Sequence, residues 1–224
     1  MLAPTDLFDL SQTEHAGIFD GCAYAWDALK HIKEYIATHL KPDRFHREIV
    51  GCHIGPDVFI GEGTVIEPGV MIKGPAIIGR NCEIRHNAYI RENVIIGDGC
   101  VIGNSCEFKN ALLFNQCQVP HFNYVGDSIF GHKAHCGAGV KISNVKLVPG
   151  NVILEWEGQK YDTGLRKFGA LLGDNTDIGC NAVLNPGTII GRYSVVYPNT
   201  NWRGILRSGC MAKNTAQIEI TVRR

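Results

Sequence analysis

Two groups of residues have the types and the spacing that acid–base chemistry and anion binding require. His121 lies in segment 120–127, which also carries a tyrosine and an aspartate. An imidazole titrates near neutral pH, so an exposed one can take the proton of an attacking amine. Lys73, Arg91 and Lys109 follow one another at intervals of 18 residues. Cations at neighbouring heights can grip one phosphate together, the arginine by two parallel hydrogen bonds.

Both groups also have a simpler interpretation. A single exposed histidine is most often a surface residue, and the cations have Glu92 and Glu107 nearby as surface partners. His132 and His135 are three residues apart but lack a clear third ligand. A protein zinc site needs three or four ligands, so the sequence predicts no metal site.

A period of six residues determines how these side chains are arranged. From residue 54 onward every sixth residue is apolar. A period of six fits neither a helix nor a plain strand, but it fits short strands joined by tight turns. Three such strands close a coil of about 18 residues, and coils stack about 4.8 Å apart. The apolar series is Ile54, Ile60, Ile66, Ile72, Ile78, Ile84, Ile90, Ile96, Ile102, Phe108 and Phe114.

Stacking of this kind places residues 18 apart on one outer face. Lys73, Arg91 and Lys109 therefore form a vertical column of cations, and His121 falls on a different face. Four places after each residue of the apolar series lies a small or apolar residue, and Gln118 is the first exception. After it the apolar series resumes with a shift of four residues, at Phe130, Cys136, Ile142 and, later, Leu172, Ile178, Leu184, Ile190 and Val196.

The pattern divides the chain into three parts. Residues 1–48 are expected to form a helical segment, with an amphipathic helix over 24–40 that caps the open end of the coils. Residues 49–201 are the repeats, interrupted by a projecting loop at about 147–171. Residues 202–224 are expected to hold a loop and a final strand.

Composition narrows the class of protein. The formal net charge is zero, which gives no support for a nucleic-acid partner. No segment approaches the roughly 20 apolar residues that cross a membrane, and the N-terminus lacks the pattern of a signal peptide. The nine cysteines form no Cys-x-x-Cys pair, which favours reduced thiols in the cytoplasm.

Several motifs resemble one enzyme family. The hexads are typical of acyltransferases with an all-β, left-handed parallel β-helix, and the handedness comes from this resemblance. Segments 107–110, 121–127 and 137–139 resemble the C-terminal acetyltransferase domain of the bifunctional glucosamine-1-phosphate acetyltransferase and N-acetylglucosamine-1-phosphate uridyltransferase. They also resemble archaeal sugar-1-phosphate nucleotidyltransferases with a similar domain, as does segment 162–170.

The resemblance assigns roles to individual residues. His121 matches the catalytic base, and Arg91, Lys109 and Tyr124 match the contacts to the sugar phosphate. Asn144 matches an asparagine beside the thioester of acetyl-CoA. Two further residues are expected in the site: His135, which stands where the family has an asparagine that contacts substrate, and Cys180, beside the pantetheine of the cosubstrate.

These observations predict an acetyl-CoA-dependent N-acetyltransferase of UDP-N-acetylglucosamine biosynthesis. Its acceptor would be an amino-sugar phosphate such as glucosamine-1-phosphate. A backbone N–H near 137–139 would bind the thioester oxygen. Because base and cations lie on different faces, the site is expected between the subunits of a homotrimer. The uridyltransferase half has no counterpart in the sequence. Two alternatives stay open: a non-catalytic assembly or regulatory subunit, and an acyltransferase acting on a nucleotide-linked amino sugar.

Overall fold

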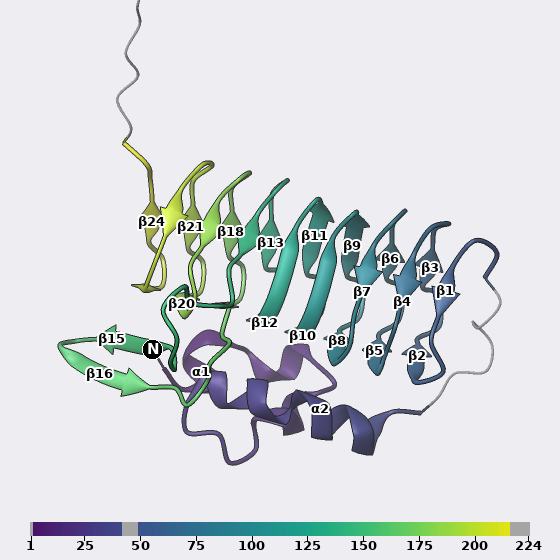
Figure 1. The fold of residues 1–224 in the computed structure, drawn as a ribbon, viewed down its shortest axis with the longest axis horizontal. Helices are drawn as coiled ribbons and strands as arrows, with labels where there is room; N and C mark the ends of the chain where they lie inside the picture. The colour runs from purple at the N-terminus through teal and green to yellow at the C-terminus, as the bar shows by residue number, and fades with distance from the viewer. Residues whose placement is uncertain (1, 42–48, 216–224) are drawn as a thin grey trace, which may run out of the picture.

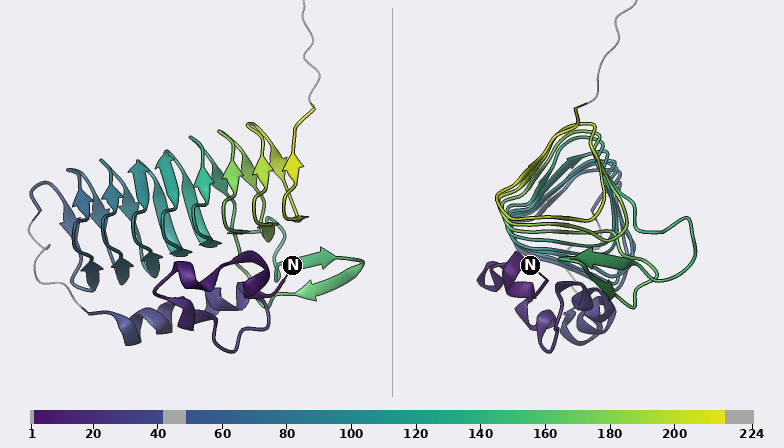
Figure 2. Two further views of the ribbon diagram at one scale, coloured as in Figure 1. Left: turned by 180° about the vertical axis from the view of Figure 1, so that it is seen from behind. Right: turned by 90° about the vertical axis from the view of Figure 1, so that its left-hand side faces the viewer.

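The chain folds into a three-sided parallel β-helix with a helical layer along one side (Figure 1). The computed structural model describes residues 2–41 and 49–215. Figure 2 shows the triangular cross-section of the coils. The fold predicted from the hexads, a parallel β-helix with a projecting loop, is confirmed.

Each of the three walls is a ladder of short parallel strands. The first wall contains β1 (His53–Ile54), β4 (Met71–Ile72), β7 (Tyr89–Ile90), β10 (Glu107–Leu113), β12 (Tyr124–Phe130), β14 (Lys141–Ile142), β19 (Val183–Leu184) and β22 (Asn201–Trp202). The second wall contains β2 (Val58–Ile60), β5 (Ala76–Ile78), β8 (Val94–Ile96), β17 (Ala170–Leu172), β20 (Thr188–Ile190) and β23 (Ile205–Leu206), together with the ends of β10 and β12.

The third wall is a separate sheet of the described residues. It contains β3 (Val65–Ile66), β6 (Glu83–Ile84), β9 (Val101–Asn104), β11 (Gln118–His121), β13 (His135–Cys136), β18 (Asp177–Ile178), β21 (Val195–Val196) and β24 (Met211–Ala212). Asparagines with positive φ, such as Asn81, Asn87 and Asn93, sit at the corners, because asparagine tolerates the left-handed backbone that the turns need.

The step between coils shortens twice, which corrects the predicted phase. Leu113 pairs with Ile96 and with Phe130, so each of these steps covers 17 residues instead of 18. Leu113 lies in the core of the coils, whereas Phe114 faces outward and its ring contacts that of Phe8 at 5.2 Å. The shift expected as one step after Gln118 is therefore made in two steps of one residue, which begin before it. The apolar residues predicted after the shift, such as Phe130, Cys136 and Ile142, do lie in the core.

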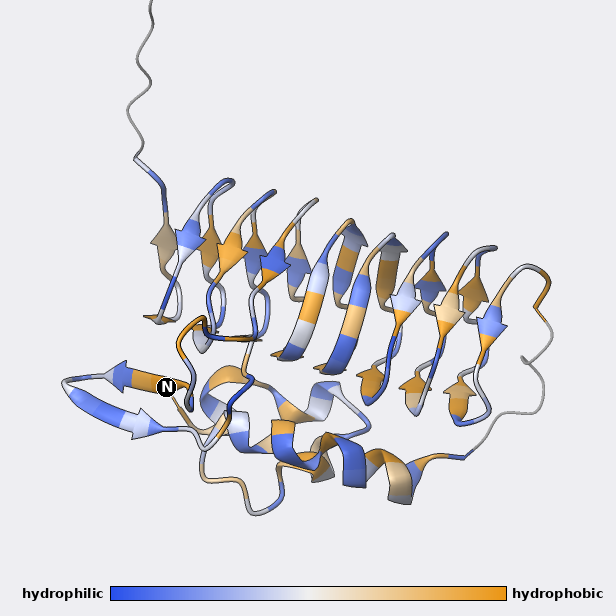
Figure 3. Ribbon diagram, in the orientation of Figure 1, coloured by the Kyte–Doolittle hydropathy of each residue, from blue (hydrophilic) through white to orange (hydrophobic). Residues whose placement is uncertain are grey.

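The helical layer covers the second wall and does not cap the end of the coils. It contains α1 (Pro4–Leu7), α2 (Ala28–His39) and short 3₁₀ turns at Leu10–Gln12, Ala16–Phe19 and Ala25–Asp27. Figures 1 and 2 show both helices beside this wall. The reason is a column of apolar side chains that point out of the wall, on strands that Figure 3 shows as hydrophobic: Phe59, Ile77, Ile95, Leu112, Ile129, Leu171 and Ile189.

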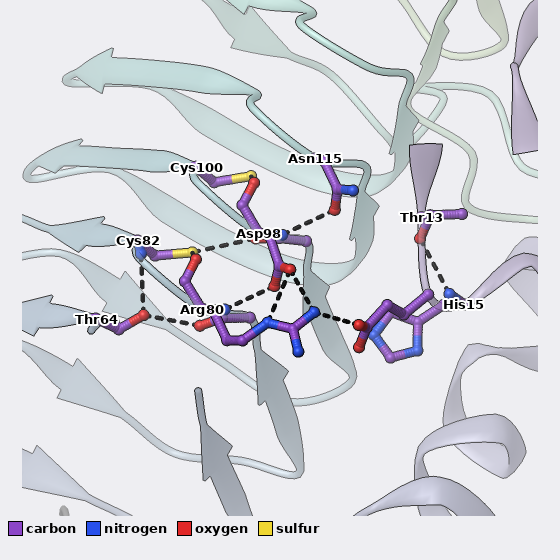
Figure 4. A network of polar contacts seen from close by, with 11 residues as sticks. Thr13, His15, Thr64, Arg80, Cys82, Asp98, Cys100 and Asn115 are labelled. Atoms are coloured by element: carbon purple, nitrogen blue, oxygen red, sulfur yellow. Dashed lines mark hydrogen bonds and ion pairs between the residues drawn. The ribbon is translucent and has the colours of Figure 1, made fainter. Parts of the chain in front are cut away.

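Polar contacts hold the layer against the corner between the second and third walls. Arg80 donates from Nε and Nη2 to Asp98 at 3.1 and 2.8 Å, and it also pairs with Glu14 of the layer (Figure 4). The Asp98 amide donates to the side chain of Asn115 in the next coil, at 2.9 Å. Farther along the same corner, the Asp9 amide donates to the buried carboxylate of Asp174 at 2.7 Å.

The predicted projecting loop contains an antiparallel hairpin. Its strands are β15 (Ile153–Trp156) and β16 (Gln159–Asp162), and Phe168 is buried where the loop rejoins the coils. Coils continue to Ala212, beyond the boundary expected at residue 201. The strand expected in the C-terminal tail, at 217–222, lies outside the described residues. No helix in the described residues is long and apolar enough to cross a membrane.

Five buried cysteines lie inside the coils. Cys82, Cys100 and Cys117 occupy one corner at successive levels, and their thiols donate to backbone carbonyls of the next coil at 3.1, 3.2 and 3.0 Å. Burial raises the pKa of Cys106, as it does for Cys136. These thiols are packed as small apolar residues.

Candidate active site on the first wall

The three cations lie in one column on the outside of the first wall. Each directly follows a core residue, and those residues are paired between successive coils, Ile72 with Ile90 and Ile90 with Phe108. The predicted column of Lys73, Arg91 and Lys109 is therefore present. Coils are about 4.8 Å apart, so the three side chains can address a single extended ligand.

Two carboxylates lie among these cations. Arg91 pairs with Glu107 at 3.0 Å and with Glu92 at 3.5 Å, while Lys109 shares Glu92 at 3.4 Å. The surface pairing considered from the sequence is thus present. The Nε of Arg91 is buried and has no hydrogen-bond partner within the described residues. A bound phosphate would have to share or displace these carboxylates.

A buried polar network supports the wall beside the cations. Asp127 is 6% exposed and accepts hydrogen bonds from the amides of Asn110, at 2.9 Å, and Asn144. The three residues are spaced by 17 and share one corner of successive coils. Asn110 and Asp127 both have a left-handed backbone, with φ of 46° and 47°.

Tyr124 and Asn144 converge above Gly126. A Cβ at Gly126 would lie 2.7 Å from the Asn144 amide nitrogen and 2.8 Å from the Tyr124 hydroxyl, so a larger residue would push both aside. Burial raises the pKa of the Tyr124 phenol, the Glu107 and Asp127 carboxylates raise it further, and a hydrogen bond with Asn144 opposes the rise. The phenol therefore stays neutral and can donate a hydrogen bond to a ligand on the wall.

His121 lies at the corner where the third wall turns into the first. It is exposed, and within the described residues its imidazole has no hydrogen-bond partner. Its backbone is fixed, because the His121 carbonyl accepts the amide of Gly139 at 3.0 Å. Phe122 beside it is 61% exposed, and the two rings are 6.4 Å apart. The corner thus presents an imidazole without a hydrogen-bond partner in the described residues and an exposed aromatic ring.

His135 and Cys180 lie on a different wall from the cations. The Nδ1 of His135 is 3.1 Å from Asp177, on the outside of the third wall. Cys180 is exposed and lines an open cavity of about 280 Å³ together with Gly137 and Tyr197. One chain therefore brings Arg91, Lys109, Tyr124 and Asn144 together, with His121 at the edge, and leaves His135 and Cys180 apart.

Sequence reasoning missed the network around Asp127. The signal was the 17-residue spacing of Asn110, Asp127 and Asn144, which a fixed 18-residue coil conceals. Sequence reasoning did anticipate Glu92 and Glu107 as partners of the cations.

Two family models match parts of the coils. Residues 72–158 match the family model of the GMPPB C-terminal domain, and residues 170–199 match that of the hexapeptide repeat of succinyl-transferase. The first match contains Arg91, Lys109, His121, Tyr124 and Asn144. The resemblance found in the motifs is thereby confirmed.

Two similar curated proteins come from archaea. A bifunctional sugar-1-phosphate nucleotidylyltransferase/acetyltransferase of Sulfurisphaera tokodaii is 36% identical over 88 residues, which is 39% of this chain and 22% of the relative. The bifunctional protein GlmU of Methanococcus vannielii is 34% identical over 89 residues, 40% of this chain and 21% of the relative. The chain spans about a fifth of the length of these relatives. The name of the Sulfurisphaera tokodaii relative includes an acetyltransferase.

Among solved structures, LpxA from Acinetobacter baumannii aligns with 73% of this chain and 63% of its own. The TM-score is 0.41 and the sequence identity is 21%.

Proposed function

We propose that this chain is an acetyl-CoA-dependent N-acetyltransferase whose acceptor is an amino-sugar phosphate such as glucosamine-1-phosphate. The observation that carries the proposal is the free imidazole of His121, three residues before Tyr124 and at the edge of the wall that carries Arg91 and Lys109. A base, a hydrogen-bond donor and a cation pair are the groups that this acceptor requires.

The reaction moves one acetyl group and one proton. The sugar amine reacts in its neutral form, after its ammonium has released one proton to solvent. As the nitrogen attacks the thioester carbonyl carbon, His121 takes a second proton from it, so that the product is a neutral amide. The tetrahedral intermediate then collapses, the carbon–sulfur bond breaks, and the departing thiolate of CoA receives the proton from His121. Arg91 and Lys109 hold the phosphate, Tyr124 donates to the sugar, and Asn144 lies beside the thioester.

The thioester oxygen needs a hydrogen-bond donor, and a backbone N–H near 137–139 is the proposed one. The amide of Gly137 already donates to the Ile178 carbonyl at 2.7 Å, and the amide of Gly139 donates to His121. The amides of these two glycines are therefore occupied, whereas the amide of Ala138 between them donates to no acceptor within the described residues and stays the candidate donor in 137–139. The side-chain amide of Asn144 is engaged by Asp127 and by Tyr124.

A homotrimer would complete the site. The helical layer covers the second wall, while the first and third walls are bare in the described residues. His121, His135 and Cys180 border the third wall, and the cations lie on the first. Packing the third wall of one chain near the first wall of another would bring the two sets together. Sedimentation should give three times the 24.6 kDa chain mass, and an active monomer would refute the shared site.

The test of the chemistry is release of CoA from acetyl-CoA in the presence of glucosamine-1-phosphate. His121→Ala should lower kcat by about 10²- to 10⁴-fold. The matched control is His86→Ala, an exposed histidine two coils away in the same corner column, and it should keep full activity. Unchanged turnover in His121→Ala would remove the proposed base. A wild-type chain that does not bind acetyl-CoA would favour the non-catalytic alternative.

A further inference from the structure

Lys73 extends the cation column by one coil beyond the residues used above. It is exposed, and its Nζ lies 5.2 Å from the centroid of the Tyr89 ring in the next coil. Within the described residues no carboxylate pairs with it, in contrast to Arg91 and Lys109. The ring holds the ammonium above the wall without neutralising it.

The charges of the column do not balance. Lys73, Arg91 and Lys109 contribute +3, and the carboxylates of Glu92 and Glu107 contribute −2, which leaves +1. Both carboxylates contact Arg91, and Glu92 also contacts Lys109, so the excess positive charge lies at Lys73. A single phosphate on Arg91 and Lys109 would leave this charge unused.

We propose that Lys73, held by Tyr89, binds a second phosphoryl group, so that the site accepts, besides a sugar monophosphate, a diphosphate ester such as a nucleoside-diphosphate-linked amino sugar. This inference rests on the proposed function for the placement of the first phosphoryl group at Arg91. Successive coils are about 4.8 Å apart, which suits adjacent phosphoryl groups held by flexible side chains. Lysine offers three donors as a compact charge, which fits a terminal or bridging phosphate without a fixed geometry.

Calorimetry of the full chain with pyrophosphate and with inorganic phosphate tests this site. The wild-type chain should bind pyrophosphate more tightly than phosphate. Lys73→Met should weaken pyrophosphate binding about fivefold and phosphate binding less than twofold, because an exposed ion pair is worth only about that much. Lys73→Arg should restore most of the loss, and added salt should weaken the wild type more than Lys73→Met.

A lysine in the same arrangement on another wall provides the control. Lys213 lies 4.9 Å from the centroid of the Tyr197 ring, away from the cation column, so Lys213→Met should leave both affinities unchanged. Equal affinities of the wild type for the two anions, or no change in Lys73→Met, would overturn the inference.

The acetylation assay separates this inference from the proposed function. Pyrophosphate binding that depends on Lys73 in a chain without acetyl transfer would leave the diphosphate site standing and remove the proposed function. His121-dependent acetylation of glucosamine-1-phosphate together with unchanged pyrophosphate binding in Lys73→Met would leave the proposed function standing and remove the diphosphate site.

Discussion

Asp127→Asn removes one negative charge from the corner that supports the candidate site. The substitution keeps the shape of the side chain and suits the left-handed backbone at this position, where φ is 47°. It leaves one acceptor oxygen for two amide donors, those of Asn110 and Asn144. The NH2 group that the substitution introduces must then face the donating amide group of Asn110 or of Asn144.

The magnitude follows from burial and from the type of hydrogen bond. A hydrogen bond to a charged group contributes about 1.5–3 kcal/mol, and an unsatisfied buried donor costs about 1–3 kcal/mol. Asp127 is 6% exposed, so solvent screens the interaction little. We therefore expect the variant to lose about 2–3 kcal/mol in the free energy of unfolding.

Urea unfolding followed by circular dichroism measures this loss. The control is Asp177→Asn on the third wall, where the carboxylate contacts His135 but is 64% exposed, and its cost should stay below about 1 kcal/mol. In Asp127→Asn the pKa of Tyr124 should fall, because one of the carboxylates that raise this pKa is gone. An Asp127→Asn variant that unfolds within about 0.5 kcal/mol of the wild type, which is about the error of such curves, would refute the reasoning.

Three further outcomes are expected. Gly103→Ala should abolish folding of the central coils, because its Cβ would lie 1.5 Å from the carbonyl oxygen of Pro120; expression and circular dichroism report it. Hydrogen bonds from Arg85 lower the pKa of Glu83, so this pair stabilises the folded state above the ordinary carboxyl pKa. The stabilisation should be lost as the pH falls through the lowered pKa of Glu83, and thermal unfolding between about pH 3 and 7 measures that loss. Phe168→Ala should cost about 3–5 kcal/mol by urea unfolding, because its ring is fully buried.

Matched variants make these outcomes decisive. Gly17→Ala should fold normally, because a Cβ there would lie 3.6 Å from the nearest atom, a side-chain oxygen. Glu83→Gln should flatten the acid limb of the stability curve, and an unchanged limb would contradict the assignment. Phe122→Ala should cost under about 1 kcal/mol, since this ring is largely exposed.

Periodicity predicted the coils because each core residue must be apolar at a fixed interval. It misplaced Phe114 because Leu113 and Phe114 are both apolar, and the pattern cannot tell a residue inside the coil from one beneath the helical layer. Only the pairing of Leu113 with Ile96 reveals the shorter coil.

The helical layer was misplaced for a related reason. Its position was readable from Ile77, Ile95 and Leu112, whose side chains all leave the second wall. Seven apolar residues on one outer face require a cover, whereas the end of the coils has no comparable demand. The cation column was predicted correctly, because its register depends on coils of 18 residues, which hold up to Phe108.

The meeting of base and cations is beyond the reach of one sequence. His121 and Arg91 belong to different coils and different walls. In the trimer proposed above, their approach would depend on how copies of the chain pack. The spacing of residues in the sequence gives the register within one coil stack, but not how a second stack would pack against it.

The interior thiols give this fold a set of built-in reporters. Cys82, Cys100 and Cys117 each sit at a different level, sealed from solvent by the coil around them. An alkylating reagent reaches such a sulfur only when that level opens. Variants that retain one interior cysteine at a time would therefore map, level by level, where the prism first comes apart.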